Sequence, residues 1–263
     1  MKKRYFVYVL SALSVLGIVS YSAYEYLSEP QNEEYSLVTH NMNFDISENS
    51  AIEASDTLIQ SYSISDFEQI LQEPELPTGC EVTSLTMVLT HLGFDVSKVD
   101  IAQKYLPKQE LDRNEDNELF GPDFRNTFAG NPEDDVSFGC LAPCIAQTAD
   151  KYIKSQKSDY EAKDITGTAF YDLFEYISEN KPVIIWSTQK LKKPEYITSW
   201  KIYETQETMT WPTNEHCVVL TGYDYTNNTV QINDPLEGKV TLEMEKVKQR
   251  YDQIGRNAVI ISD

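Results

Sequence analysis

Cys80 stands at the predicted start of a helix, where a thiol is suited to act as a nucleophile. It follows the turn-forming residues Pro77, Thr78 and Gly79, and apolar side chains recur after it at helical spacing until Gly93. Unpaired backbone N–H groups and the positive end of the helix dipole favour the thiolate form there. We therefore predict a reactive cysteine with a lowered pKa, against the alternative of a small buried side chain.

A thiol nucleophile needs a base to accept its proton, and the sequence contains three histidines. His40 lies in an acidic segment, and His91 lies about three helical turns beyond Cys80. His216 opens a β-rich run, where a side chain at a strand end is held rigidly and can point across a cleft. His216 is therefore the predicted base, both by elimination and by context.

Asp234 is the predicted group that orients the imidazole of this base. A hairpin that turns near residues 227–228 would place the strand that begins at His216 beside the strand that ends at Asp234. Asp224 is a second carboxylate on the His216 strand, but it lies closer to the turn. A simple turn role before Pro235 is the alternative for Asp234.

Two donors are candidates for stabilising an oxyanion that develops at the thiol. One is the backbone N–H of Cys80 at the helix start. The other is the side-chain amide of Gln72, which lies eight residues upstream on the approach loop. An exposed polar loop residue is the alternative interpretation of Gln72.

Composition limits the partners of the chain. The 263 residues include 42 acidic and 22 basic side chains, which gives a formal net charge of −20. Such a surface repels phosphate backbones, so we expect no nucleic-acid partner. Cationic peptides or wall polymers suit it better, although acidity also maintains solubility.

The four cysteines are too few for a disulfide scaffold. Cys140 and Cys144 have a spacing found in zinc fingers, but no second ligand pair follows them. We therefore expect neither a metal site nor a cofactor. A disulfide between two of Cys140, Cys144 and Cys217 stays open at this point.

The N-terminus has the pattern of an export signal. Three basic residues at positions 2–4 precede a run from Tyr5 to Tyr24 without charge. Because about 20 apolar residues suffice to cross a bilayer, we predict that residues 1–24 form a signal peptide or, preferably, an uncleaved single-pass anchor. Residues 25–58 are predicted to form an acidic extracytoplasmic stalk, and residues 59–263 the folded domain. The protein would be secreted if the signal were cleaved.

The remaining pattern predicts an α+β fold in which a helical N-terminal half packs on a C-terminal antiparallel sheet. Helices are expected from Cys80, over 97–105, from near Pro143 and after Thr168. Strands are expected over 182–188, 216–223, 229–233 and 258–261. Residues 107–139 are punctuated by Gly and Pro and are expected to form a long loop that could line a substrate groove.

Five ordered motifs resemble the stand-alone relatives of the double-glycine leader peptidases, the C-thirty-nine-like cysteine peptidases. They lie at residues 76–85, 137–143, 181–186, 215–223 and 232–235. The resemblance implies a papain-like fold and a Cys-His-Asp triad at Cys80, His216 and Asp234. It also implies an upstream glutamine that serves the oxyanion, which we place at Gln72. Because no Walker-type glycine loop is present, we expect no ATP and do not carry over the substrate of the transporter-linked members.

The expected function is that of an extracytoplasmic cysteine peptidase or amide hydrolase that acts on peptides and is held at the membrane by its N-terminal helix. The alternative is a catalytically silent papain-like module that binds peptide or wall polymer. Acyl transfer to amines, rather than to water, is a third reading that the sequence does not separate from hydrolysis.

Overall fold

The computed structural model describes residues 59–263 of the chain. The predicted anchor over residues 1–24 and the predicted stalk over residues 25–58 lie outside the described residues. Within residues 59–263, every helix is too short or too polar to cross a lipid bilayer.

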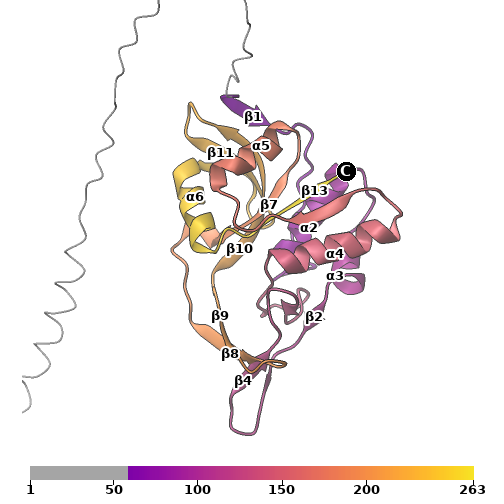
Figure 1. Ribbon diagram of the computed structural model, residues 1–263, viewed down its shortest axis with the longest axis vertical. Helices are drawn as coiled ribbons and strands as arrows, with labels where there is room; N and C mark the ends of the chain where they lie inside the picture. The colour runs from indigo at the N-terminus through magenta and orange to yellow at the C-terminus, as the bar shows by residue number, and fades with distance from the viewer. Residues whose placement is uncertain (1–58) are drawn as a thin grey trace, which may run out of the picture. The chain divides into compact units, whose positions relative to one another are not determined.

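A seven-stranded antiparallel sheet is the largest element of residues 59–263 (Figure 1). Its strand order is β12-β11-β10-β7-β13-β6, and β1 pairs with the far end of β10. Strands β7, β10 and β13 are buried along almost their whole length, because helices cover both sides of them. The strands are β1 (Ser61–Ser63), β6 (Glu161–Asp164), β7 (Val183–Thr188), β10 (Glu215–Asp224), β11 (Thr229–Asp234), β12 (Gly238–Glu243) and β13 (Ala258–Ser262).

Five α-helices accompany this sheet in the described part of the chain. In Figure 1, α2, α3 and α4 gather on one side of the strands, and α5 and α6 lie on the other. Helix α2 packs on β10 and β7, α4 packs on β6 and β13, and α6 packs on β7, β11 and β12. The helices are α2 (Cys80–His91), α3 (Lys98–Lys104), α4 (Ala142–Ser155), α5 (Leu173–Ser178) and α6 (Met244–Gln253).

The predicted α+β class is confirmed, and most of the expected elements are present. Ser97 caps α3 by accepting the N–H of Asp100, and Pro143 lies in the first turn of α4. The expectation of a helical N-terminal half followed by a C-terminal sheet is wrong in one respect, because helix α6 lies between β12 and β13. Only Met244, Val247 and Tyr251 of this helix are buried, and they are separated by polar residues, so the segment lacks the apolar run that marked the other elements.

Residues 107–139 are not the structureless loop that their composition predicts. They contain four short strands, β2 (Lys108–Gln109), β3 (Asp112–Arg113), β4 (Leu119–Gly121) and β5 (Phe128–Ala129). Strand β4 pairs with β8 (Thr198–Ile202), which pairs with β9 (Thr208–Trp211). A small separate core of Phe124, Ala129, Trp200 and Trp211 holds this second sheet together. Strands of two or three residues are too short to show alternation, so the sequence pattern missed them.

Helix α2 is enclosed rather than amphipathic. Every residue from Cys80 to Leu89 is buried, including the polar Thr83 and Ser84. Ser84 satisfies its hydroxyl by donating to the carbonyl of Cys217 on β10, at 3.2 Å. A helix buried all round has a fixed position, so its first residue is held against the sheet.

Lys98 ties the loop that carries Gln72 to helix α3. Its Nζ donates to the carbonyls of Leu71 at 2.5 Å and Gln72 at 2.6 Å, and it pairs with Glu75 at 2.8 Å. The side chain of Lys98 is only 10% exposed. The ammonium therefore closes a buried polar network that fixes the backbone of Gln72.

We predict that Lys98→Met lowers the free energy of unfolding by about 1–3 kcal/mol, because two buried carbonyls lose a charged donor. Urea denaturation followed by circular dichroism measures this loss. Lys104→Met is the matched control, since Lys104 lies on the same helix in an exposed pair with Asp100 and should change stability little. Equal effects of the two substitutions would contradict the anchoring role of Lys98.

Candidate active site

Cys80 is the first residue of α2, as predicted, and its thiol lies in a tight turn. The turn leaves no space for a side chain at the preceding Gly79, because a Cβ there would lie 2.7 Å from the Cβ of Leu76. Sγ of Cys80 accepts the backbone N–H of Cys217 at 3.4 Å and donates to Oε2 of Glu81 at 3.3 Å. The thiol is therefore held between the start of α2 and the start of β10, and only 8% of the residue is exposed.

His216 and Asp234 form a buried hydrogen bond of 2.7 Å between Nε2 and Oδ1. His216 lies near the start of β10, and Asp234 ends β11, which is the adjacent strand of the predicted hairpin. The same Oδ1 accepts the backbone N–H groups of Leu236 at 2.7 Å and Glu237 at 3.2 Å. Asp234 thus makes the expected turn contacts and also reaches the histidine.

The charge of this pair is fixed by its surroundings. Burial alone would raise the pKa of Asp234, but the hydrogen bond and charge of His216 and the two backbone donors lower it below its usual value. Asp234 is therefore an ionised acceptor, so Nε2 of His216 must carry the shared proton. In a neutral imidazole this leaves Nδ1 as the acceptor.

The other sequence candidates lie elsewhere. Asp224 accepts from Asn227 in the turn at the opposite end of the hairpin. His91 packs its ring on Phe67, with 5.2 Å between centroids. His40 lies outside the described residues.

Cys80, His216 and Gln72 line one small cavity of about 110 Å³. Ser137 and Phe138, from the end of the segment expected to line a groove, also contribute to its wall. A second cavity of about 330 Å³ is lined by His216, Asp234 and mostly apolar surface. His216 contributes to the walls of both cavities.

Gln72 is buried, contrary to the alternative of an exposed loop residue, with 2% of its surface exposed. Its Nε2 donates to the carbonyl of Pro77 at 2.6 Å, and its backbone N–H donates to the carbonyl of Pro235. An amide nitrogen has two hydrogens, and the carbonyl of Pro77 accepts one of them. The position suits an oxyanion donor, and that role stays a prediction.

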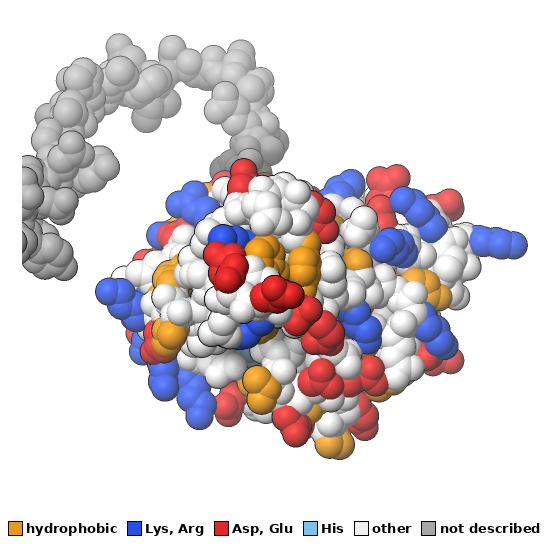
Figure 2. Space-filling view, turned by 90° about the horizontal axis from the view of Figure 1, so that it is seen from below, with side chains coloured by type: hydrophobic (Ala, Val, Ile, Leu, Met, Phe, Trp, Pro, Cys, Tyr) orange, Lys and Arg blue, Asp and Glu red, His pale blue; other side chains and the backbone are white. Residues whose placement is uncertain are grey.

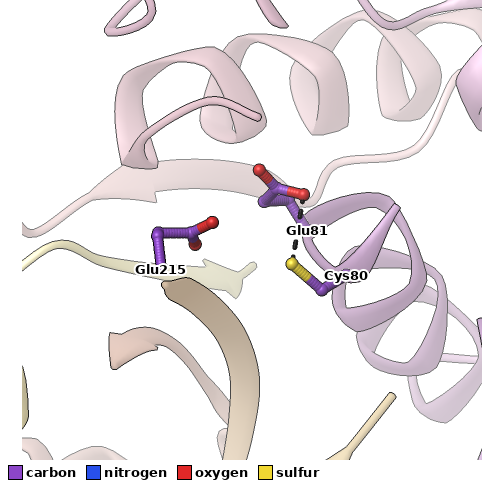
Figure 3. Close-up of side chains that lie close together, drawn as sticks. All are labelled: Cys80, Glu81 and Glu215. Carbon is purple, nitrogen blue, oxygen red and sulfur yellow. Dashed lines mark hydrogen bonds between the residues drawn. The ribbon is translucent and has the colours of Figure 1, made fainter. Parts of the chain in front are cut away.

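Sequence reasoning missed two carboxylates beside the thiol, Glu81 and Glu215 (Figure 3). Both are buried, and their oxygens and the Cys80 sulfur lie within 4.8 Å of one another. Burial raises the pKa of Glu81 to about 7, although the N–H of Cys140 and the Cys80 thiol donate to it. Burial and the charge of Glu81 raise the pKa of Glu215 well above its usual value. Each residue adjoins a predicted catalytic residue in sequence, which was the only available signal.

The prediction of a lowered thiol pKa is wrong for this arrangement. Burial first, and then the charges of Glu81 and Glu215, raise the pKa of the Cys80 thiol well above its usual value. The N–H of Cys217 opposes this shift but does not reverse it. Desolvation and two neighbouring acids outweigh the helix dipole, so the resting residue is a neutral thiol.

The four cysteines are all free and buried. The disulfide that the sequence left open between two of Cys140, Cys144 and Cys217 is therefore not formed.

Comparison with known families matches residues 63–259 to the Peptidase C39-like family. The chain belongs to this family. The resemblance inferred from the five sequence motifs is thereby confirmed, and the α+β fold of this C39-like chain agrees with it.

Two relatives place the chain more closely. It is 28% identical over 192 residues to the uncharacterized protein YvpB of Bacillus subtilis strain 168, a match that covers 73% of this chain and 72% of that protein. The crystal structure of a protein classed as a C39-like peptidase from Bacillus anthracis is similar with a TM-score of 0.66 and 30% identity. That match covers 77% of this chain and 98% of the other.

We predict that alkylation of Cys80 by iodoacetamide has a midpoint above the ordinary thiol pKa of about 8.5, because the neutral thiol persists until the pH passes its raised pKa. Mass spectrometry of the peptide that contains Cys80 gives the rate at each pH. Glu81→Gln should move the midpoint to lower pH, because it removes a neighbouring negative charge.

Glu161→Gln, on the exposed edge strand β6, is the control and should leave the profile unchanged. A wild-type midpoint below 8.5 would show that the thiolate is stabilised after all.

Proposed function

We propose that the protein is a cysteine peptidase, or a closely related amide hydrolase, that cleaves peptide substrates with a triad of Cys80, His216 and Asp234. The observation that carries the proposal is the buried 2.7 Å hydrogen bond from Nε2 of His216 to Asp234, made by a histidine that lines the same cavity as Cys80. This bond directs Nδ1 of a neutral imidazole to act as an acceptor. Membership of a peptidase family supports the same reaction.

The raised pKa of Cys80 indicates general-base catalysis rather than a preformed ion pair. His216 removes the thiol proton as Sγ attacks the substrate carbonyl, and Asp234 stabilises the resulting imidazolium. The imidazolium then protonates the leaving amine, which leaves a thioester on Cys80. Water, deprotonated by the same imidazole, hydrolyses the thioester and restores the thiol.

Two donors stabilise the oxyanion in this scheme. The first is the backbone N–H of Cys80, which begins α2 and has no partner within its own helix. The second is the remaining hydrogen on Nε2 of Gln72, whose position is fixed by Pro77 and by the Lys98 network. A donor that is already oriented loses little free energy to reorganisation as the charge develops.

The charge of the protein favours a cationic peptide substrate. Residues 108–139, whose end borders the cavity, carry nine acidic and three basic side chains. Figure 2 views the molecule from the end with β4, β8 and β9, where many acidic side chains gather near the middle of the face. An electronegative surface raises the local concentration and the association rate of a cationic chain.

We place the reaction outside the cytoplasm, at the membrane surface. The support is the sequence pattern of residues 2–24, in which three basic residues precede an uncharged run that suits an anchor. The acidic residues 25–58 would hold the domain away from the bilayer.

A catalytically silent module that binds peptide is the second candidate. The observation that favours it is the neutral thiol of Cys80, which donates a hydrogen bond to Glu81 and not to His216. Only the peptidase hydrolyses peptides, so the hydrolysis rates of the wild type and of a variant without the Cys80 thiol distinguish the two functions.

We predict that Cys80→Ala reduces hydrolysis of a Lys- and Arg-rich peptide library to the uncatalysed rate and abolishes labelling by a thiol-directed active-site probe. The fold should survive, because the replacement removes one buried atom. Cys144→Ala is the matched control, since Cys144 is also buried but does not line the cavity. Turnover that persists in Cys80→Ala contradicts the triad, and a wild type that binds peptides without cleaving them supports the silent module.

We predict that Asp234→Asn lowers kcat/KM by about 10²–10⁴-fold, because a neutral amide does not stabilise the charge of the imidazolium that forms. Asp224→Asn, at the other end of the hairpin, should leave kcat/KM near the wild-type value. Steady-state kinetics on the best library peptide compares the two. Equal losses would show that Asp234 acts only through the stability of the hairpin.

A further inference from the structure

We propose that Cys80, Glu81 and Glu215 form a binding site for a thiophilic divalent metal ion such as Zn²⁺, and that the bound ion blocks the thiol. The sequence predicted no metal site, because its cysteine and histidine spacing offers none. The blocking effect rests on the proposed peptidase function, whereas the binding itself does not.

The three side chains converge on one point. Figure 3 shows the carboxylate of Glu215 directed toward Glu81 and the Cys80 sulfur from the opposite side of the gap. Sγ of Cys80 and Oε2 of Glu81 are 3.3 Å apart, and all three ligand atoms lie within 4.8 Å of one another. Ligand atoms on a tetrahedral zinc ion are separated by about 3.5 Å, given bond lengths of about 2.3 Å to sulfur and 2.0–2.2 Å to oxygen. A small rotation of Glu215 closes the remaining difference.

The side chain of Glu215 has a buried oxygen that lacks a hydrogen-bond donor within residues 59–263. Among the described residues, its Oε1 is one of the few buried side-chain oxygens that no donor contacts, although the residue is only 6% exposed. A buried carboxylate oxygen without a partner costs free energy, and a cation in the gap would remove that cost. This unpartnered oxygen, Oε1, belongs to the Glu215 carboxylate that faces the Cys80 thiol.

Glu81 is held in place for this role. Its Oε1 accepts the backbone N–H of Cys140 at 2.8 Å, which leaves Oε2 directed at the sulfur. Gly139 makes this approach possible, because a Cβ at that position would lie 2.3 Å from Oε1 of Glu81. One carboxylate is thus fixed by the backbone and the other is free to adjust.

The ligand chemistry selects the class of ion. Thiolate sulfur favours Zn²⁺ and Cd²⁺ over Mg²⁺ and Ca²⁺, which prefer oxygen ligands alone. Cys80 and Glu215 both line the 110 Å³ cavity, which gives the ion an entry path and a place for a water molecule as fourth ligand. The thiol proton, and any proton that Glu81 or Glu215 holds because burial raises its pKa, leaves to solvent as the three groups bind the metal. Coordination to the metal ion draws electron density from the sulfur, so the bound thiolate is a weaker nucleophile towards a carbonyl.

Binding is tested on the full chain in detergent, with two readouts that do not depend on activity. Competition with a chromophoric chelator gives the Kd for Zn²⁺, and the thiolate-to-metal absorption band of Cd²⁺ reports sulfur ligation. Glu215→Gln should raise the Kd for Zn²⁺ at least about tenfold, since even outer-shell changes at metal sites have effects of that size. Glu161→Gln should leave it unchanged. Cys80→Ser should abolish the Cd²⁺ band, and Cys144→Ser should retain it.

Inhibition is tested on the same proteins. Zn²⁺ should inhibit wild-type peptide hydrolysis at concentrations near its Kd, and a chelator should restore the rate. Lack of saturable Zn²⁺ binding, equal affinity in Glu215→Gln, or a Cd²⁺ band that depends on Cys144 instead of Cys80 would each overturn the site. If the protein binds Zn²⁺ specifically but hydrolyses no peptide even when it is free of metal, the proposed function is refuted and the metal site stands.

Discussion

The hydrogen bond between His216 and Asp234 is the interaction on which the rest of the site depends. It joins β10 and β11, the two strands of the hairpin, at the end that borders the cavity. Because Asp234 is an ionised acceptor, the bond also fixes the imidazole proton on Nε2. Two backbone N–H groups hold the carboxylate and a fully buried strand holds the histidine, so neither partner has to be ordered during a reaction. Helix α2, buried on all sides, then presents Cys80 to the same cavity.

The same burial that fixes these groups also opposes ionisation of the thiol. Cys80 lies beside two buried carboxylates and has little contact with water, so its pKa rises instead of falling. This has two consequences for chemistry at the sulfur. In the proposed mechanism, nucleophilic attack is coupled to proton transfer to His216. In the proposed metal site, the thiol and the two acids gain more from a cation than an ordinary cysteine site would.

Local patterns predicted the elements that carry the chemistry. Capping by Ser97, the proline in α4 and the β-rich runs on either side of the turn at residues 227–228 are short-range signals, and the hairpin followed from the last of them. The small sheet around Trp200 and Trp211 pairs segments far apart in sequence through very short strands, so no window of sequence contains its signal. Glu81 and Glu215 were missed for the same reason. They meet only because α2 packs on β10, and this contact also reverses the expected shift in the pKa of Cys80.

Nitrogen NMR of the His216 imidazole tests the central claim most directly. With ¹⁵N-labelled histidine and His216→Gln to assign the signals, the chemical shifts of the two ring nitrogens report which one carries the proton. The account predicts, for the neutral ring, a protonated Nε2 with a downfield hydrogen-bonded proton that disappears in Asp234→Ala, and an unprotonated Nδ1. A neutral ring protonated at Nδ1, or an Nε2 proton unaffected by Asp234→Ala, would contradict it.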